Sequence, residues 1–253
     1  SDALGAPRPP TGIRARMAGI RFGKESEDGG SPRAAPAASV PAAASAQRTQ
    51  PPSLPPPPAS SAPRPGGILL AGATDKKIAV AMLEKNGLAP SPENIAALLD
   101  EYLAHLETRI PKHNGRVLPG MIELLEILAK REEAVLALLT GNVVRGAEIK
   151  LAHYGVWHHF EFGAFADDHH DRNELGKFAR ARALDRHGIE FPPERIYVIG
   201  DTPRDIECGR AIGAKTVAIA TGHYSHEELA EHSPDFLFED FSDTARVVEC
   251  LLG

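Results

Sequence analysis

A strand, a helix and a second strand follow one another within residues 195–222, and this succession constrains the fold most. The run RIYVIGD is short and apolar, PRDIECGRAIG carries at its start a proline that favours helix initiation, and KTVAIATG is apolar again. Upstream, AVLALLTGN (134–142) is a further apolar run, and helical patterns cover residues 143–155 and 174–188. Strands that alternate with helices predict an α/β fold, a doubly wound, Rossmann-like parallel sheet with helices on both faces.

Three more helices are predicted before this alternation begins. Residues 74–88 end at an Asn-Gly pair, and residues 91–110 open with Ser91 as a helix cap and Pro92 in the first turn. Residues 119–131 are the third. The first two, over residues 75–110, form a separate helical insert in this interpretation.

Residues 1–66 differ in composition from the rest of the chain. They hold most of the 22 prolines and few large apolar side chains. Such a segment buries too little apolar surface to offset the entropy of ordering it, so we expect it to be disordered or polyproline-like. Its arginines and alanines suit a transit peptide, whereas Glu25, Glu27 and Asp28 argue against one.

Net charge, hydropathy and cysteine spacing indicate which classes of partner and which location to expect. The net charge is -6, which does not indicate a nucleic-acid surface. No apolar run approaches the roughly 18 residues of a membrane span. Cys208 and Cys250 stand in neither a metal nor a redox spacing, which favours reduced thiols and a cytoplasmic location. The sequence does not give the oligomeric state.

Two carboxylates stand just beyond a predicted strand. Asp201 follows the strand, and Asp205 lies four positions on, in the first turn of the next helix, so both can face one space. Two like charges held together require a proton, a basic group or a metal ion between them, and a pair of oxygen ligands suits Mg²⁺. The alternative is that both acids merely favour the N-terminal end of the helix dipole.

A second polar group ends the strand at residues 134–139, and we expect this strand end to neighbour the one that carries Asp201. Thr140, Gly141 and Asn142 offer a hydroxyl, a flexible backbone and an amide to an anionic oxygen such as that of a phosphate. The alternative is that Thr140 is an ordinary turn residue.

The runs LALLTGN and YVIGDTPRDIECGRAIGAKTVAIATG together resemble two motifs of the haloacid dehalogenase-like hydrolase superfamily, over residues 68–253, and most closely its phosphoglycolate-phosphatase-like branch. The resemblance divides the chain into residues 1–66, a small helical cap region at 67–115 and an α/β core at 116–253. It implies a magnesium-dependent phosphatase that acts on a small phosphorylated metabolite. The implied roles are phosphoryl binding for Thr140, beside Gly141 and Asn142, and Mg²⁺ binding for Asp201, supported by Asp205. Arg172 is the first choice for the cation of the site, and Lys177 is the second.

The resemblance also implies a nucleophilic aspartate, which attacks phosphorus and forms an aspartyl-phosphate that water then hydrolyses. In the family it ends a central strand in a DxDGT-like motif, and this chain has no such motif. RFGKESEDGGS stands near the expected place, where Ser26 would occupy the nucleophile position and no apolar strand precedes it. A misread N-terminal coding region, a non-catalytic binding protein on the same scaffold, and an unrecognised nucleophile are the three interpretations.

Two further function classes are weaker. The paired histidines in WHHF and DDHHDR could bind a transition metal, although adjacent histidines point in different directions along a strand. A response-regulator-like receiver also places acids at strand ends, but it lacks a helical insert.

Overall fold

The computed structural model describes residues 13–15, 20–21, 72–113 and 115–253, the first two ranges by their backbone alone. Six parallel strands form one sheet, in the order β5-β4-β1-β6-β7-β8, and β2 and β3 form an antiparallel pair. The strands are β1 (Ile13–Ala15), β2 (Ile20–Arg21), β3 (Arg116–Val117), β4 (Val135–Leu139), β5 (Phe162–Ala164), β6 (Tyr197–Gly200), β7 (Lys215–Ile219) and β8 (Phe236–Phe238).

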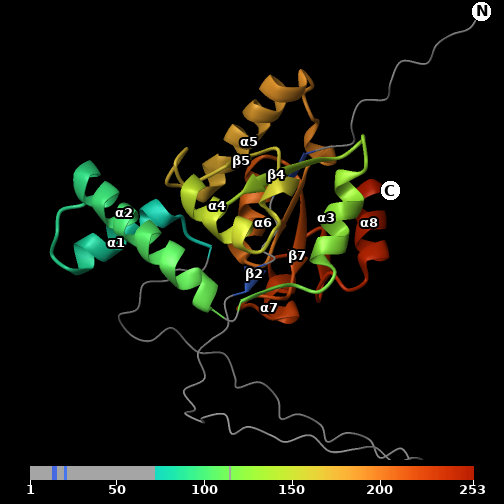
Figure 1. Cartoon of the computed structure of the whole chain (residues 1–253). Helices are drawn as coiled ribbons and strands as arrows, with labels where there is room; N and C mark the ends of the chain where they lie inside the picture. The colour runs from blue at the N-terminus through green and yellow to red at the C-terminus, as the bar shows by residue number, and fades with distance from the viewer. Residues whose placement is uncertain (1–12, 16–19, 22–71, 114) are drawn as a thin grey trace, which may run out of the picture. The chain divides into compact units, whose positions relative to one another are not determined.

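Eight α-helices accompany the strands in the described part of the chain (Figure 1). They are α1 (Asp75–Lys85), α2 (Pro92–Arg109), α3 (Met121–Ala129), α4 (Val144–His153), α5 (Arg172–His187), α6 (Pro203–Ala211), α7 (His226–Glu231) and α8 (Thr244–Leu252). The parallel α/β sheet confirms the predicted fold class. The predicted cap of α2 is also present, because the Ser91 hydroxyl accepts a hydrogen bond from the backbone N–H of Asn94.

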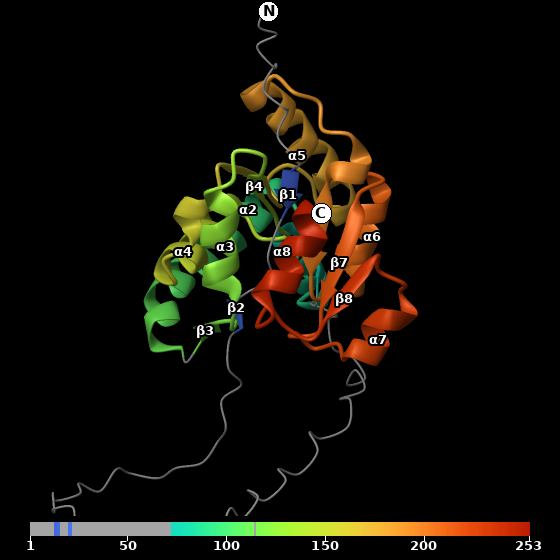
Figure 2. The ribbon, with the colours of Figure 1, turned by 90° about the vertical axis from the view of Figure 1, so that its right-hand side faces the viewer.

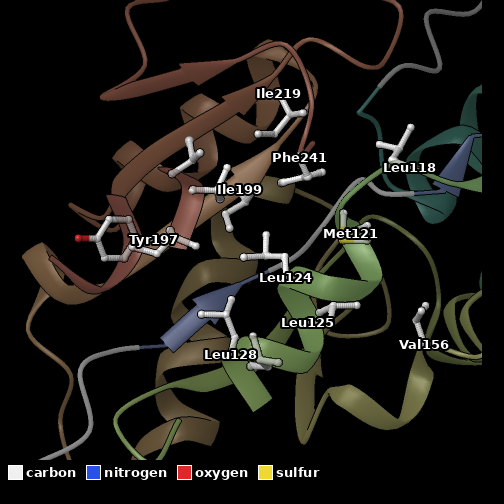
Figure 3. Close-up of a cluster of buried hydrophobic side chains, with 14 residues drawn as sticks. Leu118, Met121, Leu124, Leu125, Leu128, Val156, Tyr197, Ile199, Ile219 and Phe241 are labelled. Carbon is white, nitrogen blue, oxygen red and sulfur yellow. The ribbon is translucent and has the colours of Figure 1, made fainter. Parts of the chain in front are cut away.

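The two faces of the sheet bury different sets of side chains. On one face, Val135, Ala137 and Leu139 of β4 and Val198 of β6 pack against α5 and α6. On the other, Leu136, Tyr197, Ile199 and Val217 pack against α3 and α8. Figure 3 shows the second cluster, in which leucines of α3 face Tyr197 and Ile199. Side chains of neighbouring positions therefore alternate between two buried faces, as a doubly wound sheet requires.

The strand β1 lies inside the sheet, between β4 and β6. Figure 2 shows β1 next to β4. Its register pairs Ala15 with Ala137 on one side and with Val198 on the other. Residues 1–66 were expected to contain little regular structure, and for β1 and β2 that expectation is wrong. Backbone pairing explains the difference, because β1 pairs with both β4 and β6, and β2 pairs with β3. Such pairing favours a strand whatever the local composition. The rest of that segment, Ser26 and Asp28 included, lies outside the described residues.

The sheet order also corrects the expected distance between the two polar strand ends. Thr140 follows β4 and Asp201 follows β6, and we expected these strands to be neighbours. They are instead separated by β1. Both residues still lie at the same edge of the sheet, because the strands run parallel. None of the described helices is both long and apolar enough to cross a membrane.

Candidate functional site

The loop after β4 is held against the start of α1 by a close backbone contact. The N–H of Asp75 donates to the carbonyl oxygen of Gly141 at 2.6 Å. A Cβ atom on Gly141 would lie 2.5 Å from the carbonyl oxygen of Ala73, which no side chain tolerates. Thr140 is buried, and its hydroxyl accepts a hydrogen bond from the N–H of Asn142 at 3.2 Å. The three residues predicted to bind phosphate thus form one compact turn at the edge of the sheet.

Asp75 completes this turn and is a residue that the sequence analysis did not assign to the site. Its carboxylate accepts hydrogen bonds from the backbone N–H of Val143, at 2.8 Å, and from the side-chain amide of Asn142, at 3.2 Å. Burial raises the pKa of Asp75, and the nearby positive charge of Lys150 and these hydrogen bonds only partly offset that rise. The carboxylate therefore links the first turn of α1 to the start of α4.

The residue at the start of α4 is the sequence feature that could have indicated this link. Val143 is the N-cap residue of α4 and has no side chain that could accept from the first turn. Two remote carboxylates supply the missing acceptors: Asp75 binds the N–H of Val143, and Asp167 binds the N–H of Val144 at 2.6 Å. A helix that begins without a Ser, Thr, Asp or Asn cap indicates that an acceptor comes from elsewhere.

Asp205 is buried at the N-terminal end of α6, where both of its carboxylate oxygens have partners. One oxygen accepts from the N–H of Thr202, at 3.1 Å, and from its hydroxyl, at 2.8 Å. The other forms an ion pair with Arg172. A Cβ atom on Gly200 would lie 2.1 Å from the carboxylate carbon of Asp205, so only glycine fits at the end of β6. Asp205 is not among the residues that line the cavity described below.

Arg172 is the first residue of α5 and is 6% exposed. Besides its ion pair with Asp205, it donates to the carbonyl oxygen of Gly72 at 3.0 Å. Its Nε is buried and has no hydrogen-bond partner among the described residues. Lys177, the second choice for the cation, is exposed and paired with Glu174 at 2.7 Å. Of the two candidates, only Arg172 reaches the cavity.

A cavity of about 640 Å³ opens over these strand ends. Its polar side is formed by Thr140, Asn142, Arg172 and Asp201. Asp201 is partly exposed and packs against Gly222, where a Cβ atom would lie 2.3 Å from a carboxylate oxygen. The remaining lining residues are Gly72, Ala73, Asp75, Ile78, Ala79, Met82, Leu98, Leu99, Tyr102, Gly141, Lys150, Thr202 and His223.

The oxygen ligands around the cavity suit Mg²⁺. This ion is usually held by one or two carboxylates together with waters and phosphate oxygens, rather than by a complete protein cage. Asp201 offers a carboxylate inside the cavity, and the Thr140 hydroxyl lies in the same lining. Asp205 contributes differently from the prediction, because its oxygens are bound to Arg172 and Thr202. The residues present therefore fit a site with one protein carboxylate.

Within each histidine pair the two rings lie close together, tilted for His158 and His159 and stacked for His169 and His170. The ring centroids are 4.1 Å apart for His158 and His159 and 4.5 Å apart for His169 and His170. Within the described ranges, no group of three or more His, Cys, Asp or Glu side chains is arranged to hold a metal ion. Cys208 and Cys250 are free thiols. The transition-metal alternative thus finds no ligand set in this part of the chain.

Comparison with known proteins agrees with the motifs. A family model described as HAD-hydrolase-like matches residues 174–244. A phosphoglycolate phosphatase of Haemophilus influenzae is 27% identical over 143 residues, which cover 53% of this chain and 58% of that protein. A phosphoglycolate phosphatase of Mannheimia succiniciproducens is 27% identical over 168 residues, or 60% of this chain and 69% of that protein. The chain thus matches 58% of the length of the first relative and 69% of the length of the second.

The fold has counterparts among solved structures. The crystal structure of CbbY from Rhodobacter sphaeroides in complex with phosphate aligns with a TM-score of 0.55 and 20% sequence identity. The alignment covers 69% of this chain and 76% of CbbY. At this identity, the likeness concerns the fold alone.

Proposed function

We propose, from the premise that this chain belongs to the haloacid dehalogenase-like hydrolases and their phosphoglycolate-phosphatase-like branch, that its cavity binds a small phosphate monoester together with Mg²⁺. The proposal depends on one observation: Thr140, Arg172 and Asp201 line the same cavity. They come from the end of β4, the start of α5 and the end of β6. A hydroxyl, a guanidinium and a carboxylate at one strand edge provide both the donors for a phosphate and a ligand for the ion that accompanies it.

Each residue has a distinct part in this proposal. The Thr140 hydroxyl and the backbone around Gly141 bind phosphate oxygens, and Asn142 keeps the turn in shape through its hydrogen bond to Asp75. Arg172 supplies positive charge beside the phosphate, and Asp205 holds its guanidinium in place. Asp201 would hold Mg²⁺, which when bound offsets the negative charge of the phosphate.

The nucleophile is the missing part. The family reaction needs a carboxylate oxygen that attacks phosphorus, and its aspartate ends the central strand. In this chain β1 is the central strand, and the residues that follow it in sequence are Arg16, Met17, Ala18 and Gly19. None of them carries a carboxylate. Among the described lining residues, the acids are Asp201 and Asp75, and the oxygens of Asp75 already accept hydrogen bonds from Val143 and Asn142. We therefore infer that this chain hydrolyses phosphate monoesters very slowly.

A second candidate function follows from the same observation. A chain that keeps the phosphate-binding groups and lacks the attacking group would act as a ligand- or partner-binding protein on a phosphatase scaffold. Binding without turnover distinguishes it from an active phosphatase.

Phosphate release from phosphoglycolate and other small monoesters, measured with and without Mg²⁺, tests the proposal. We expect turnover near the background for the unmodified chain. Replacing residues 1–66 by a segment with an apolar strand and a DxDGT motif should restore magnesium-dependent turnover, and Asp201→Asn should abolish it again. Rapid turnover by the unmodified chain, lost in Asp201→Asn, would contradict the inferred impairment and reveal another nucleophile.

A further inference from the structure

The wall of the cavity opposite Thr140 and Asp201 is apolar. It is formed by Ile78 and Met82 of α1 and by Leu98, Leu99 and Tyr102 of α2. These side chains come from the two helices that lie beside α4 in Figure 1. The cavity therefore has one polar part, suited to a phosphate, and one part where the lining side chains of α1 and α2 are mainly apolar or aromatic.

The apolar side chains of α2 remain half-exposed. This helix has 18 residues, and none of them is buried. Its leucines that line the cavity are thus still in contact with solvent, and Met82 of α1 is 41% exposed. An apolar group of a ligand that covers such partly exposed apolar side chains at a concave site lowers the free energy of binding.

A cation, Lys150, lines the cavity together with the apolar side chains. Its positive charge partly offsets the rise that burial causes in the pKa of Asp75. Its Nζ also lies 5.6 Å from the centre of the Tyr102 ring. Lys150 thus interacts with both the Asp75 carboxylate and the Tyr102 ring.

The volume of the cavity is larger than a small anionic substrate needs. A volume of about 640 Å³ falls within the range that holds drug-sized ligands, far beyond the need of a phosphate with a two-carbon acid. A second hollow shares Met82, Leu98, Tyr102 and Lys150 with this cavity. Its other lining residues are Glu101, His105, Leu106, Arg109 and His113, so apolar and charged side chains both border it.

We propose that the cavity takes phosphate monoesters with an apolar, alkyl or aryl body, which packs against the wall formed by α1 and α2. The proposal rests on the proposed function only in placing the phosphate at Thr140 and Asp201. It names a substrate class that differs from phosphoglycolate, whose two-carbon acid would leave the leucines of α2 uncovered.

Calorimetry with phosphonates tests the proposal without any need for turnover, because their carbon–phosphorus bond is not hydrolysed. Methyl-, butyl- and hexylphosphonate are titrated into the full chain with Mg²⁺. We expect the affinity to rise about fourfold for each methylene group that the wall covers. The change in heat capacity on binding should become more negative with chain length.

Substitutions in α2 test whether this helix is the surface that binds the alkyl chain. Leu99→Asn should weaken hexylphosphonate binding about fivefold and leave methylphosphonate binding unchanged. Ala97→Asn places the same new side chain on the exposed side of the same helix and should change neither affinity. Because α2 buries no residue, both variants should keep the fold of the parent.

The outcomes separate the two proposals. Equal affinities for methyl- and hexylphosphonate would overturn the apolar wall and leave the phosphate site standing. Binding of hexylphosphonate without any binding of methylphosphonate or inorganic phosphate would support the wall and overturn the phosphate site. If none of these ligands binds, both proposals are wrong.

Discussion

At the scale of single residues, the two acids predicted as a metal pair have different surroundings. Asp201 lines the cavity, whereas Asp205 is buried against Arg172 and Thr202. We expect Asp201→Asn to weaken Mg²⁺ binding about tenfold or more with little change in stability. Asp205→Asn should instead lower the free energy of unfolding by about 3 kcal/mol, because it leaves a buried guanidinium without its partner. Calorimetry and urea unfolding measure the two effects, and equal magnesium affinity in Asp201→Asn and the parent would remove Asp201 from the site.

Asp75 gives a prediction about pH at the same scale. Its pKa is raised in the folded chain, mainly by burial, so its contribution to stability is fully present below the ordinary pKa of an aspartate and is lost as the pH rises through the folded value. The variant Asp75→Asn does not titrate. Its stability relative to the parent should therefore improve as the pH rises above about 3.9, the ordinary pKa of an aspartate. Urea unfolding of both proteins over a pH series that starts below this value measures the difference, and a difference that does not change with pH would contradict the raised pKa.

At the scale of elements, the site depends on how closely α1 approaches the loop after β4. Gly141→Ala would push a Cβ atom into the carbonyl of Ala73 and displace the segment that carries Asp75. We expect a loss of about 1–3 kcal/mol in the free energy of unfolding, together with weaker phosphate binding. Gly87→Ala is the control. Gly87 has a positive φ and no atom within 4 Å, so its replacement should cost about 1 kcal/mol and leave phosphate binding intact. Unchanged phosphate binding in Gly141→Ala would show that this contact does not shape the site.

Much of the arrangement of elements could be predicted from sequence because it is local. The alternation of apolar strands and helices after residue 134 and the Ser91 cap depend on neighbouring residues, and the structure contains them. The contribution of Asp75 to the cap of α4 could not be predicted, because it joins positions 68 residues apart through one hydrogen bond to Val143. The same holds for Asp205, whose buried partner Arg172 lies 33 residues away. The spacing in sequence placed Asp205 near Asp201, but it did not reveal that Arg172 pairs with one carboxylate oxygen of Asp205 and Thr202 with the other.

At the scale of the whole molecule, the position of β1 is the feature that local composition failed to indicate. Three residues of an otherwise proline-rich segment occupy the centre of the sheet, because parallel pairing with β4 and β6 decides their structure. The strand β1 therefore fills the centre of the sheet, while the four residues that directly follow it, 16–19, carry no carboxylate.

The central claim is that the edge of the sheet holds a phosphate site, and calorimetry of inorganic phosphate in the presence of Mg²⁺ tests it most directly. Thr140→Val keeps the shape of a buried side chain and removes its hydroxyl, and Lys177→Ala removes an exposed cation outside the cavity. The account predicts binding by the parent and by Lys177→Ala, and about tenfold weaker binding by Thr140→Val. Equal binding by Thr140→Val and the parent, or no binding by the parent, would contradict it.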